Sequence, residues 1–416
     1  MKIFARNFRG FKELSIDMSK TYFLLGDNSS GKSSILYLID AVTSHDLNAP
    51  PRIEEHFGAS KFDYFSPYCD YADVDFGFVG SNDEGVQYAK LITVRRQDGA
   101  NPELIRCTHW VPGVCVTFKA LKDGTYGVAS EGPSEIDEST LLKLHRKRNK
   151  YRKLDNLKKM DMAQAAALFS VLDLEKEGHK DLLSNAWNLR ITPCRFVSPL
   201  RALPERFYSS VRKFDAQGAH FAKVWLDLTG IDDEIVERVS LFGKEANLFS
   251  SLNVKSLEAE VDDPPLLVTV RKHEKNFTLD QVGIGVSQVA PLLIDTVFSA
   301  RIDYRPILSQ QPELHLHPVA QAALGSYLYS AKKVGLTGIF ETHSSYILDR
   351  FRSDFREDKE KVVEDGVASD FKILWCCNTG EGNAVHEISV CSDGSLKGEP
   401  DKFHEFFVDE LVRTMF

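Results

Sequence analysis

The strongest constraint on this chain is a short glycine-containing loop between an apolar run and a helical pattern. The loop reads Gly26-Asp27-Asn28-Ser29-Ser30-Gly31-Lys32-Ser33, after the apolar run 22–25 and before helical spacing over 33–42. A continuous apolar run is typical of a strand that is buried on both faces. The pattern therefore predicts a strand, a tight phosphate-binding turn and a helix in direct succession.

Each part of this loop has a physical reason to hold phosphate. Glycines let backbone N–H groups turn toward an anion, and the helix N-terminus adds partial positive charge. Lys32 brings a full positive charge to the β- and γ-phosphates, and the hydroxyl of Ser33 can ligate Mg²⁺. The expected cofactors are therefore ATP and Mg²⁺. The expected nucleotide-binding residues are Gly26, Asn28, Ser29, Ser30, Gly31, Lys32, Ser33 and Ser34.

A second glycine-containing segment lies much later in the chain. Residues 282–288 read Val-Gly-Ile-Gly-Val-Ser-Gln and precede the apolar run 292–294. One interpretation is a glycine turn capped by Ser287 before an amphipathic helix. The same arrangement can also aim a serine at a γ-phosphate from a helix start. Gly285, Ser287 and Gln288 are therefore further candidates for nucleotide binding.

Two later apolar runs end in polar side chains. The run 306–309 leads into Gln310, Gln311 and Glu313, where a second strand of a phosphate-loop fold presents its Mg²⁺ ligand and its general base. His315 and His317 follow, and a structural loop is favoured over a metal pair because no third ligand is evident.

The last polar cluster follows the apolar run 338–340 and reads Glu341-Thr342-His343-Ser344. His343 is either a structural histidine or a sensor of the γ-phosphate. The order of the four motifs along the chain favours the sensor. The catalytic candidates are Gln310, Gln311, Glu313 and His343, and the metal candidates are Ser33 and Gln310.

With the four motifs in this order, the chain resembles ABC ATPases of the RecF, SMC and OLD lineage. It resembles more closely the stand-alone ATPases of bacterial anti-phage defence systems, such as AriA of PARIS and PtuA of Septu. The similar segments are 7–12, the glycine loop, 198–207, 312–318 and 341–344. The resemblance implies an α/β fold, namely an ABC-ATPase head with a mixed sheet, a phosphate-loop core and a helical insertion.

The resemblance also implies a homo-oligomer in which ATP is sandwiched between two subunits. Lys32 and Ser33 of one subunit would face Ser287 of the other, so that ATP closes the dimer and hydrolysis opens it. The stretch after His343 is too short for the Toprim nuclease of OLD-type proteins. We therefore expect the chain to act as a sensor or scaffold for a separate effector protein, either a nuclease or a toxin, in anti-phage defence.

One position departs from the family pattern. The family usually has an acid where this chain has Gln310, in a run of the form E-[EQ]-P-E. An amide such as Gln310 is a poorer Mg²⁺ ligand than a carboxylate. Gln311 occupies the usual position of the catalytic base in this family, and its amide cannot accept a proton. Glu313 is then the acid that remains nearby. Two interpretations stay open, a chain that hydrolyses ATP slowly and an introduced Glu→Gln substitution that traps ATP.

The length of 416 residues exceeds the ~250–300 residues that one hydrophobic core usually serves. We expect an N-terminal ATPase lobe at 1–130 with the glycine loop and antiparallel strands. A helical insertion follows at 131–190. A C-terminal ATPase lobe at 191–416 then carries the signature motif at 282–288, the Walker B motif at 306–313 and the H-loop motif at 341–344. The same lobe is expected to contain a hairpin at 371–377 and 385–390 and a last helix at 403–416.

The formal charge of −9 disfavours a general polyanion binder. A basic stretch between Lys143 and Lys159 is either a solvated helical face or a contact for an acidic protein or a nucleic acid. A RecF-like DNA-repair ATPase is the alternative function that the resemblance implies, and the net charge of −9 disfavours it. Scattered cysteines and the lack of an apolar leader or membrane-spanning run indicate a cytoplasmic protein.

Overall fold

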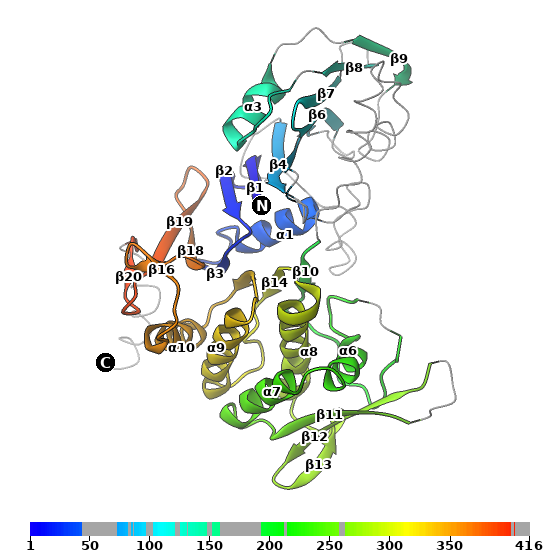
Figure 1. The fold of residues 1–416 in the computed structure, drawn as a ribbon, viewed down its shortest axis with the longest axis vertical. Coiled ribbons are helices and arrows are strands. Elements are labelled where there is room, and N and C mark those ends of the chain that lie inside the picture. Colours follow the sequence, from blue (N-terminus) through cyan, green and yellow to red (C-terminus); the bar gives the residue numbers. More distant parts are fainter. Residues whose placement is uncertain are drawn as a thin grey trace. The chain divides into compact units, whose positions relative to one another are not determined.

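The computed structural model describes residues 1–43, 73–81, 85, 87–96, 103–120, 125–130, 132–147, 152–158, 193–211, 214–257, 263–400 and 403 (Figure 1). Contacts divide the chain into two units. Unit 1 comprises 1–18, 28–193 and 377–384, and unit 2 comprises 19–27, 194–376 and 385–416. Both units mix helices with strands, which confirms the α/β class.

Unit 1 is built on a series of antiparallel strands. Their spatial order is β2, β1, β4, β5, β6, β7, β8, β9, and each neighbouring pair is antiparallel. The bounds are β1 (Lys2–Phe8), β2 (Phe11–Asp17), β4 (Asp73–Ser81), β5 (Gln87–Arg95), β6 (Glu103–Val111), β7 (Val114–Ala120), β8 (Thr125–Ser130) and β9 (Arg152–Lys158). The antiparallel strands predicted for this part of the chain are confirmed.

The described residues of unit 1 include the helices α1 (Lys32–Thr43) and α3 (Glu138–Arg146). Helix α3 starts where the Asp137 carboxylate accepts a hydrogen bond from Thr140 N at 2.7 Å, which satisfies a free donor of the first turn. Its apolar face, Leu141 and Leu142, packs into a buried cluster that includes Trp110. Burial of this face holds a helix of nine residues, which is too short to be stable alone.

Part of the predicted helical insertion at 131–190 differs from the expectation. Within that span the structure describes 132–147 and 152–158, and the second segment is strand β9 instead of a helix. Leu154 pairs in register with Tyr126 of β8. Pairing with a neighbouring strand has overridden the local preference, as is common for short segments of mixed polarity.

Unit 2 contains a parallel sheet with the order β10, β14, β15, β3, β18. The bounds are β10 (Arg195–Val197), β14 (Ile307–Gln310), β15 (Gly338–Glu341), β3 (Thr21–Gly26) and β18 (Phe371–Asn378). Every residue of β3, β10, β14 and β15 is buried. Apolar strands of this kind fit the centre of a parallel sheet, where both faces are covered.

The register of these strands sets the position of the polar motifs. Gln310 lies opposite Glu341, and Glu341 lies opposite Leu24. Because the strands are parallel, β10, β14, β15 and β3 all end at the same edge of the sheet. Ligands of open parallel sheets bind beyond this carboxyl edge.

Helices α6 (Phe221–Thr229), α7 (Asp233–Glu245), α8 (Ile284–Phe298), α9 (Pro318–Lys333) and α10 (Ser345–Glu357) complete the main body of unit 2. Smaller elements are β11 (Ser251–Ser256), β12 (Leu266–Lys272), β13 (Lys275–Thr278), β16 (Val363–Glu364), β17 (Val367–Ala368), β19 (Asn383–Val390) and β20 (Leu396–Lys397). The apolar runs 306–309 and 338–340 correspond to β14 and β15, and α9 lies between them in the sequence. The predicted helix at 403–416 lies outside the described residues except for Phe403.

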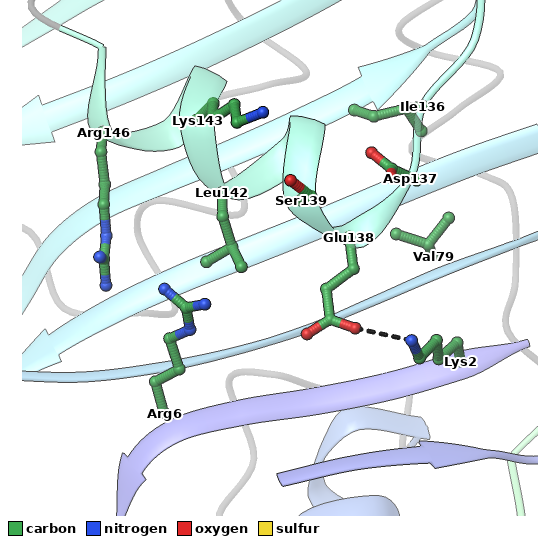
Figure 2. A pocket seen from close by; sticks show the side chains of 10 residues that line it. All are labelled: Lys2, Arg6, Val79, Ile136, Asp137, Glu138, Ser139, Leu142, Lys143 and Arg146. Atoms are coloured by element: carbon green, nitrogen blue, oxygen red, sulfur yellow. Dashed lines mark ion pairs between the residues drawn. The ribbon is translucent and has the colours of Figure 1, made fainter. Parts of the chain in front are cut away.

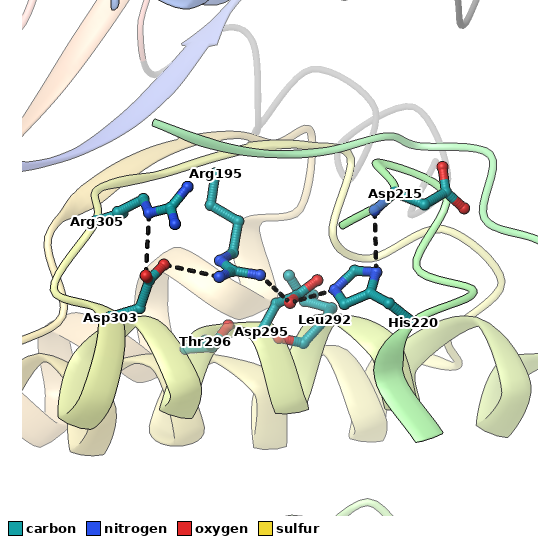
Figure 3. Close-up of polar contacts among 8 residues, drawn as sticks. All are labelled: Arg195, Asp215, His220, Leu292, Asp295, Thr296, Asp303 and Arg305. Carbon is teal, nitrogen blue, oxygen red and sulfur yellow. Dashed lines mark hydrogen bonds and ion pairs between the residues drawn. The ribbon is translucent and has the colours of Figure 1, made fainter. Parts of the chain in front are cut away.

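A buried charge network fixes helix α8 to strand β10 (Figure 3). Arg195 donates to Asp295 at 3.0 Å and to Asp303 at 2.7 Å. His220 Nδ1 accepts from the backbone N–H of Asp215 at 3.2 Å, so Nε2 carries the proton that it donates to Asp295 at 2.9 Å. Such a network holds α8 and β10 together as long as each charge keeps its partner.

In the parts of the chain that the structure describes, no helix is both long enough and apolar enough to cross a membrane.

Candidate functional site

The glycine loop has the backbone geometry of a tight turn between β3 and α1. Gly26, Ser29 and Gly31 have positive φ angles of 135°, 61° and 92°. A Cβ atom on Gly26 would lie 1.9 Å from the carbonyl oxygen of Cys376, and one on Gly31 would lie 2.6 Å from the Phe11 ring. Both glycines are therefore required by their conformation and by the backbone or ring beside them.

The side chains of the loop differ in exposure. Asp27, Asn28 and Ser29 are exposed, whereas Ser30 and Lys32 are buried. Lys32 is the first residue of α1, where the partial positive charge of the helix disfavours an ammonium group. A lysine at this place is therefore poorly explained by helix stability and well explained by an anion that binds both the lysine and the helix start.

Gln310 and Glu341 meet at the ends of β14 and β15. Gln310 Nε2 donates to Glu341 Oε2 at 3.1 Å, and each residue is 5% exposed. The amide oxygen of Gln310 is buried and has no hydrogen-bond partner among the described residues. A buried neutral oxygen beside a carboxylate is a donor set that suits Mg²⁺, so these two residues fit the metal that ATP brings.

Gln311 and Glu313 lie in the turn that follows β14. Gln311 has a φ of 44° and donates its backbone N–H to the Glu341 carbonyl at 2.7 Å. The two Glu313 oxygens accept from His343 N at 2.7 Å and from Thr342 Oγ1 at 2.8 Å. These bonds join the polar ends of β14 and β15 into one cluster.

The buried position of Glu313 changes its acidity. Burial raises the pKa of the Glu313 carboxyl, while the N–H of His343 and the hydroxyl of Thr342 act against this shift. A carboxyl with a raised pKa at a ligand-binding edge is a candidate general base. His343 itself begins the connection to α10, which Ser344 caps by accepting from Ile347 N at 3.3 Å.

The segment around Ser287 differs from the predicted capped turn. Helix α8 begins at Ile284 with Gly283 as its N-cap, so Ser287 lies inside the first turn and donates to the Ile284 carbonyl at 2.9 Å. A Cβ atom on Gly285 would lie 2.9 Å from the carbonyl oxygen of His315. The glycine thus allows the start of α8 to approach the loop that follows β14.

The Gln288 side chain is engaged with backbone. Its oxygen accepts from Arg201 N at 3.3 Å, and its nitrogen donates to the Ala202 carbonyl at 3.1 Å. Gln288 therefore ties α8 to the segment that follows β10. His317 also has a structural role, since it caps α9 through a contact of 3.5 Å with Val319 N.

Two residues of this edge, Glu341 and Arg201, have no role that the sequence pattern predicts. Both lie in segments that the sequence singles out, but neither was assigned a role. The available signal for Glu341 was a charged residue at the end of an apolar strand. Its contact with Gln310 depends on strand register across 31 residues of sequence and could not be read from local pattern.

Unit 1 contains a separate cavity of about 720 Å³ between β1 and α3 (Figure 2). Four cations line it, Lys2, Arg6, Lys143 and Arg146, together with the acids Asp137 and Glu138. Ion pairs neutralise three of the four cations, namely Lys2–Glu138 at 2.9 Å, Arg6–Glu13 at 3.1 Å and Arg146–Asp75 at 2.7 Å. The cavity contains no residue of the glycine loop and carries little net charge for an anion.

Comparison with known proteins agrees with a nucleotide-binding role. The AAA ATPase domain family matches residues 1–164, which include the entire glycine loop and α1. No curated protein matches the chain.

Solved SMC head domains are similar over nearly the whole chain, at low identity. An SMC head bound to the C-winged helix domain of ScpA is 12% identical, covers 94% of this chain and 98% of its own, and has a TM-score of 0.45. The SMC head domain from Thermotoga maritima is 11% identical, with coverages of 93% and 97% and a TM-score of 0.39. The Smc head with an extended coiled coil, bound to the C-terminal domain of ScpA from Pyrococcus furiosus, is 11% identical, with coverages of 99% and 98% and a TM-score of 0.42.

Proposed function

We propose that this chain is an ABC-class ATPase that binds ATP and Mg²⁺ at the carboxyl edge of the parallel sheet in unit 2. One observation carries the proposal. Strand β3 ends in Gly26, the first residue of the glycine loop. Strand β15 pairs with β3, β14 pairs with β15, and Gln310 and Glu341 lie opposite one another at the ends of β14 and β15. The match of residues 1–164 to an ATPase domain family supports the same activity.

Each candidate residue has a separate role in the proposed reaction. Lys32 and the N–H groups of the loop hold the β- and γ-phosphates. Gln310 and Glu341 would supply oxygens for Mg²⁺, which would neutralise charge on the transferred phosphoryl group. The sequence motif gives the hydroxyl of Ser33 the role of a further Mg²⁺ ligand. Glu313 takes a proton from the attacking water, and His343 contacts the γ-phosphate.

The signature segment at the start of α8 would bind the nucleotide of a second subunit. A Cβ atom added to Gly283 would meet no atom of the described residues within 4 Å, and Ile284 is 47% exposed. Gly283 and Ile284 are therefore open to a partner surface, whereas Ser287 itself is buried. We propose an ATP-sandwiched dimer that holds or releases a separate effector protein in anti-phage defence.

Replacement of Lys32 by alanine tests the nucleotide site. Because Lys32 brings the full positive charge to the phosphates, Lys32→Ala should abolish ATP binding in isothermal titration calorimetry. The exposed Lys359 offers a control, and Lys359→Ala should bind ATP like the wild type. Unchanged ATP affinity in Lys32→Ala would exclude the glycine loop as the nucleotide site.

A salt titration separates this proposal from a RecF-like DNA-repair ATPase. A repair protein that loads on DNA should show a steep fall of log affinity against log salt, because each phosphate contact releases a counterion. In unit 1, three of the four cations around the cavity already have acidic partners. We therefore expect weak DNA binding by the chain, and a steep salt slope would favour the repair function instead.

A further inference from the structure

Arg201 is a buried arginine whose charge lacks a hydrogen-bonded partner. The residue is 5% exposed, and all three of its guanidinium nitrogens are buried without a hydrogen bond to any described residue. Arg195, which is equally buried, instead donates to Asp295 and Asp303. A buried cation without a partner is costly, so its presence calls for a reason other than stability.

The location of Arg201 suggests that reason. The residue follows β10, whose Val197 lies in register with Ser309 of β14, and so it lies at the carboxyl edge that carries the candidate site. The acids that act on its charge are Glu313 and Asp295. Asp295 is already shared by Arg195 and His220, which leaves Glu313 as the carboxylate whose charge Arg201 can balance.

Glu313 in turn needs a positive charge. Neutral donors hold both of its oxygens, the N–H of His343 and the hydroxyl of Thr342. Among the described residues, no lysine or arginine lies within ion-pair distance of Glu313. Burial raises the pKa of this carboxyl and so favours its protonated form, and a protonated carboxyl cannot act as a base.

We propose that Arg201 is a positioning residue whose fixed positive charge keeps Glu313 ionised and ready to accept a proton. Charges inside a protein interact over longer distances than charges in water, so direct contact is not required. The inference rests on the proposed function, in which Glu313 is the general base of ATP hydrolysis.

Gln288 of helix α8 connects that helix to the segment that carries Arg201. Its amide holds the backbone of Arg201 and Ala202 through bonds of 3.3 Å and 3.1 Å. A shift of the first turn of α8 would therefore move the guanidinium relative to Glu313. In a dimer, contact of the Ser287 segment with the partner's nucleotide would then change how readily Glu313 of the same subunit accepts a proton.

A double-mutant cycle on the full chain tests the charge coupling without any nucleotide. Glu313→Gln is measured in the wild-type, Arg201→Met and Arg201→Lys backgrounds by urea unfolding at pH 7. In the wild type the change removes an attraction between Glu313 and Arg201, whereas in the Arg201→Met background burial favours the neutral form of Glu313 and the change removes no such attraction. The effect of Glu313→Gln on the unfolding constant should therefore differ at least ~10-fold between these two backgrounds, the range of neighbouring coupled sites.

The lysine variant distinguishes charge from shape. Arg201→Lys keeps the positive charge, so Glu313→Gln should change the unfolding constant in this background as it does in the wild type. If Arg201 only filled space, Glu313→Gln would have the same effect in the Arg201→Lys and Arg201→Met backgrounds. Arg305→Gln serves as the control, because Arg305 pairs with Asp303 at 3.0 Å. Its effect on the free energy of unfolding should therefore add to that of Glu313→Gln. Additivity within about 2-fold for Arg201→Met would overturn the proposal.

Turnover and ATP affinity complete the test. Arg201→Met should lower kcat at least ~10-fold with ATP affinity unchanged, and Arg201→Lys should recover most of the rate. Equal kcat in Arg201→Met and the wild type would overturn the role in catalysis even if the charges couple. Failure of the proposed function itself is seen separately, since Lys32→Ala would then bind ATP normally.

Discussion

Replacement of Gln310 by glutamate is the change that best probes the candidate metal site. The Gln310 amide donates to a Glu341 oxygen 3.1 Å away, and both side chains are buried. A glutamate would place a second carboxylate at that distance. With an effective dielectric constant of about 20, two like charges ~3 Å apart repel by about 5 kcal/mol. The lost charge-assisted hydrogen bond adds about 1.5–3 kcal/mol.

The variant should therefore depend on the metal in a way that the wild type does not. In EDTA we expect Gln310→Glu to unfold at clearly lower urea concentration than the wild type. This penalty should shrink as the pH falls, because one carboxyl of the pair then takes up a proton. With Mg²⁺ and ATP the two carboxylates become metal ligands, so the stability should recover.

Gln310→Glu should raise the rate of ATP hydrolysis, although it lowers the stability of the metal-free protein. A second carboxylate holds Mg²⁺ at the γ-phosphate more firmly, so Gln310→Glu should raise steady-state phosphate release at least ~10-fold, or about 1.4 kcal/mol of barrier. The exposed Gln217 provides a matched control, and Gln217→Glu should change neither property. An equal rate, or the same stability loss with and without Mg²⁺, would show that positions 310 and 341 do not share a metal.

Three further changes test the dimer surface, a buried histidine and the charge network. Ile284→Arg should leave ATP binding intact, since the side chain is exposed, but should block the mass increase that Mg²⁺ and ATP produce in light scattering. Burial holds the pKa of His145 well below 6.5, so below about pH 6.5 the unfolded state binds the extra proton and stability falls by up to about 1.4 kcal/mol per pH unit. His145→Gln should reduce this slope in urea titrations, and His386→Gln, at an exposed position, should not. Asp295→Asn removes a buried partner of Arg195 at 3.0 Å and should destabilise unit 2 by about 3–5 kcal/mol in urea unfolding; a loss under about 1 kcal/mol would contradict a buried pair.

The local elements of the site could be predicted from the sequence. The apolar run before Gly26 and the helical spacing after Lys32 indicate β3 and α1, because a buried strand and an amphipathic helix leave different periods in the sequence. Polar residues directly after apolar runs likewise mark the ends of β14 and β15. These signals depend on neighbours along the chain, and the strands β3, β14 and β15 and the helix α1 form where they indicate.

Other features depended on packing between distant segments. Strand β9 lies where a helix was predicted, because this segment pairs with β8, with Leu154 opposite Tyr126. Gln288 was predicted to bind nucleotide, and its amide instead holds the backbone of residues 201 and 202. Neither outcome has a local signal, since each is a hydrogen-bonding choice made by the partner segment.

The sequence by itself determined the glycine loop, the strands that lead to the carboxyl edge and the chemistry of their polar ends. Only the tertiary structure decided which of those ends meet. The parallel register of β14 and β15 brings Gln310 to Glu341, and the fold buries Arg201 where the charge of Glu313 acts on it. The physical reason is that charge interactions depend on distance and burial, which arise only when segments far apart in the sequence pack together.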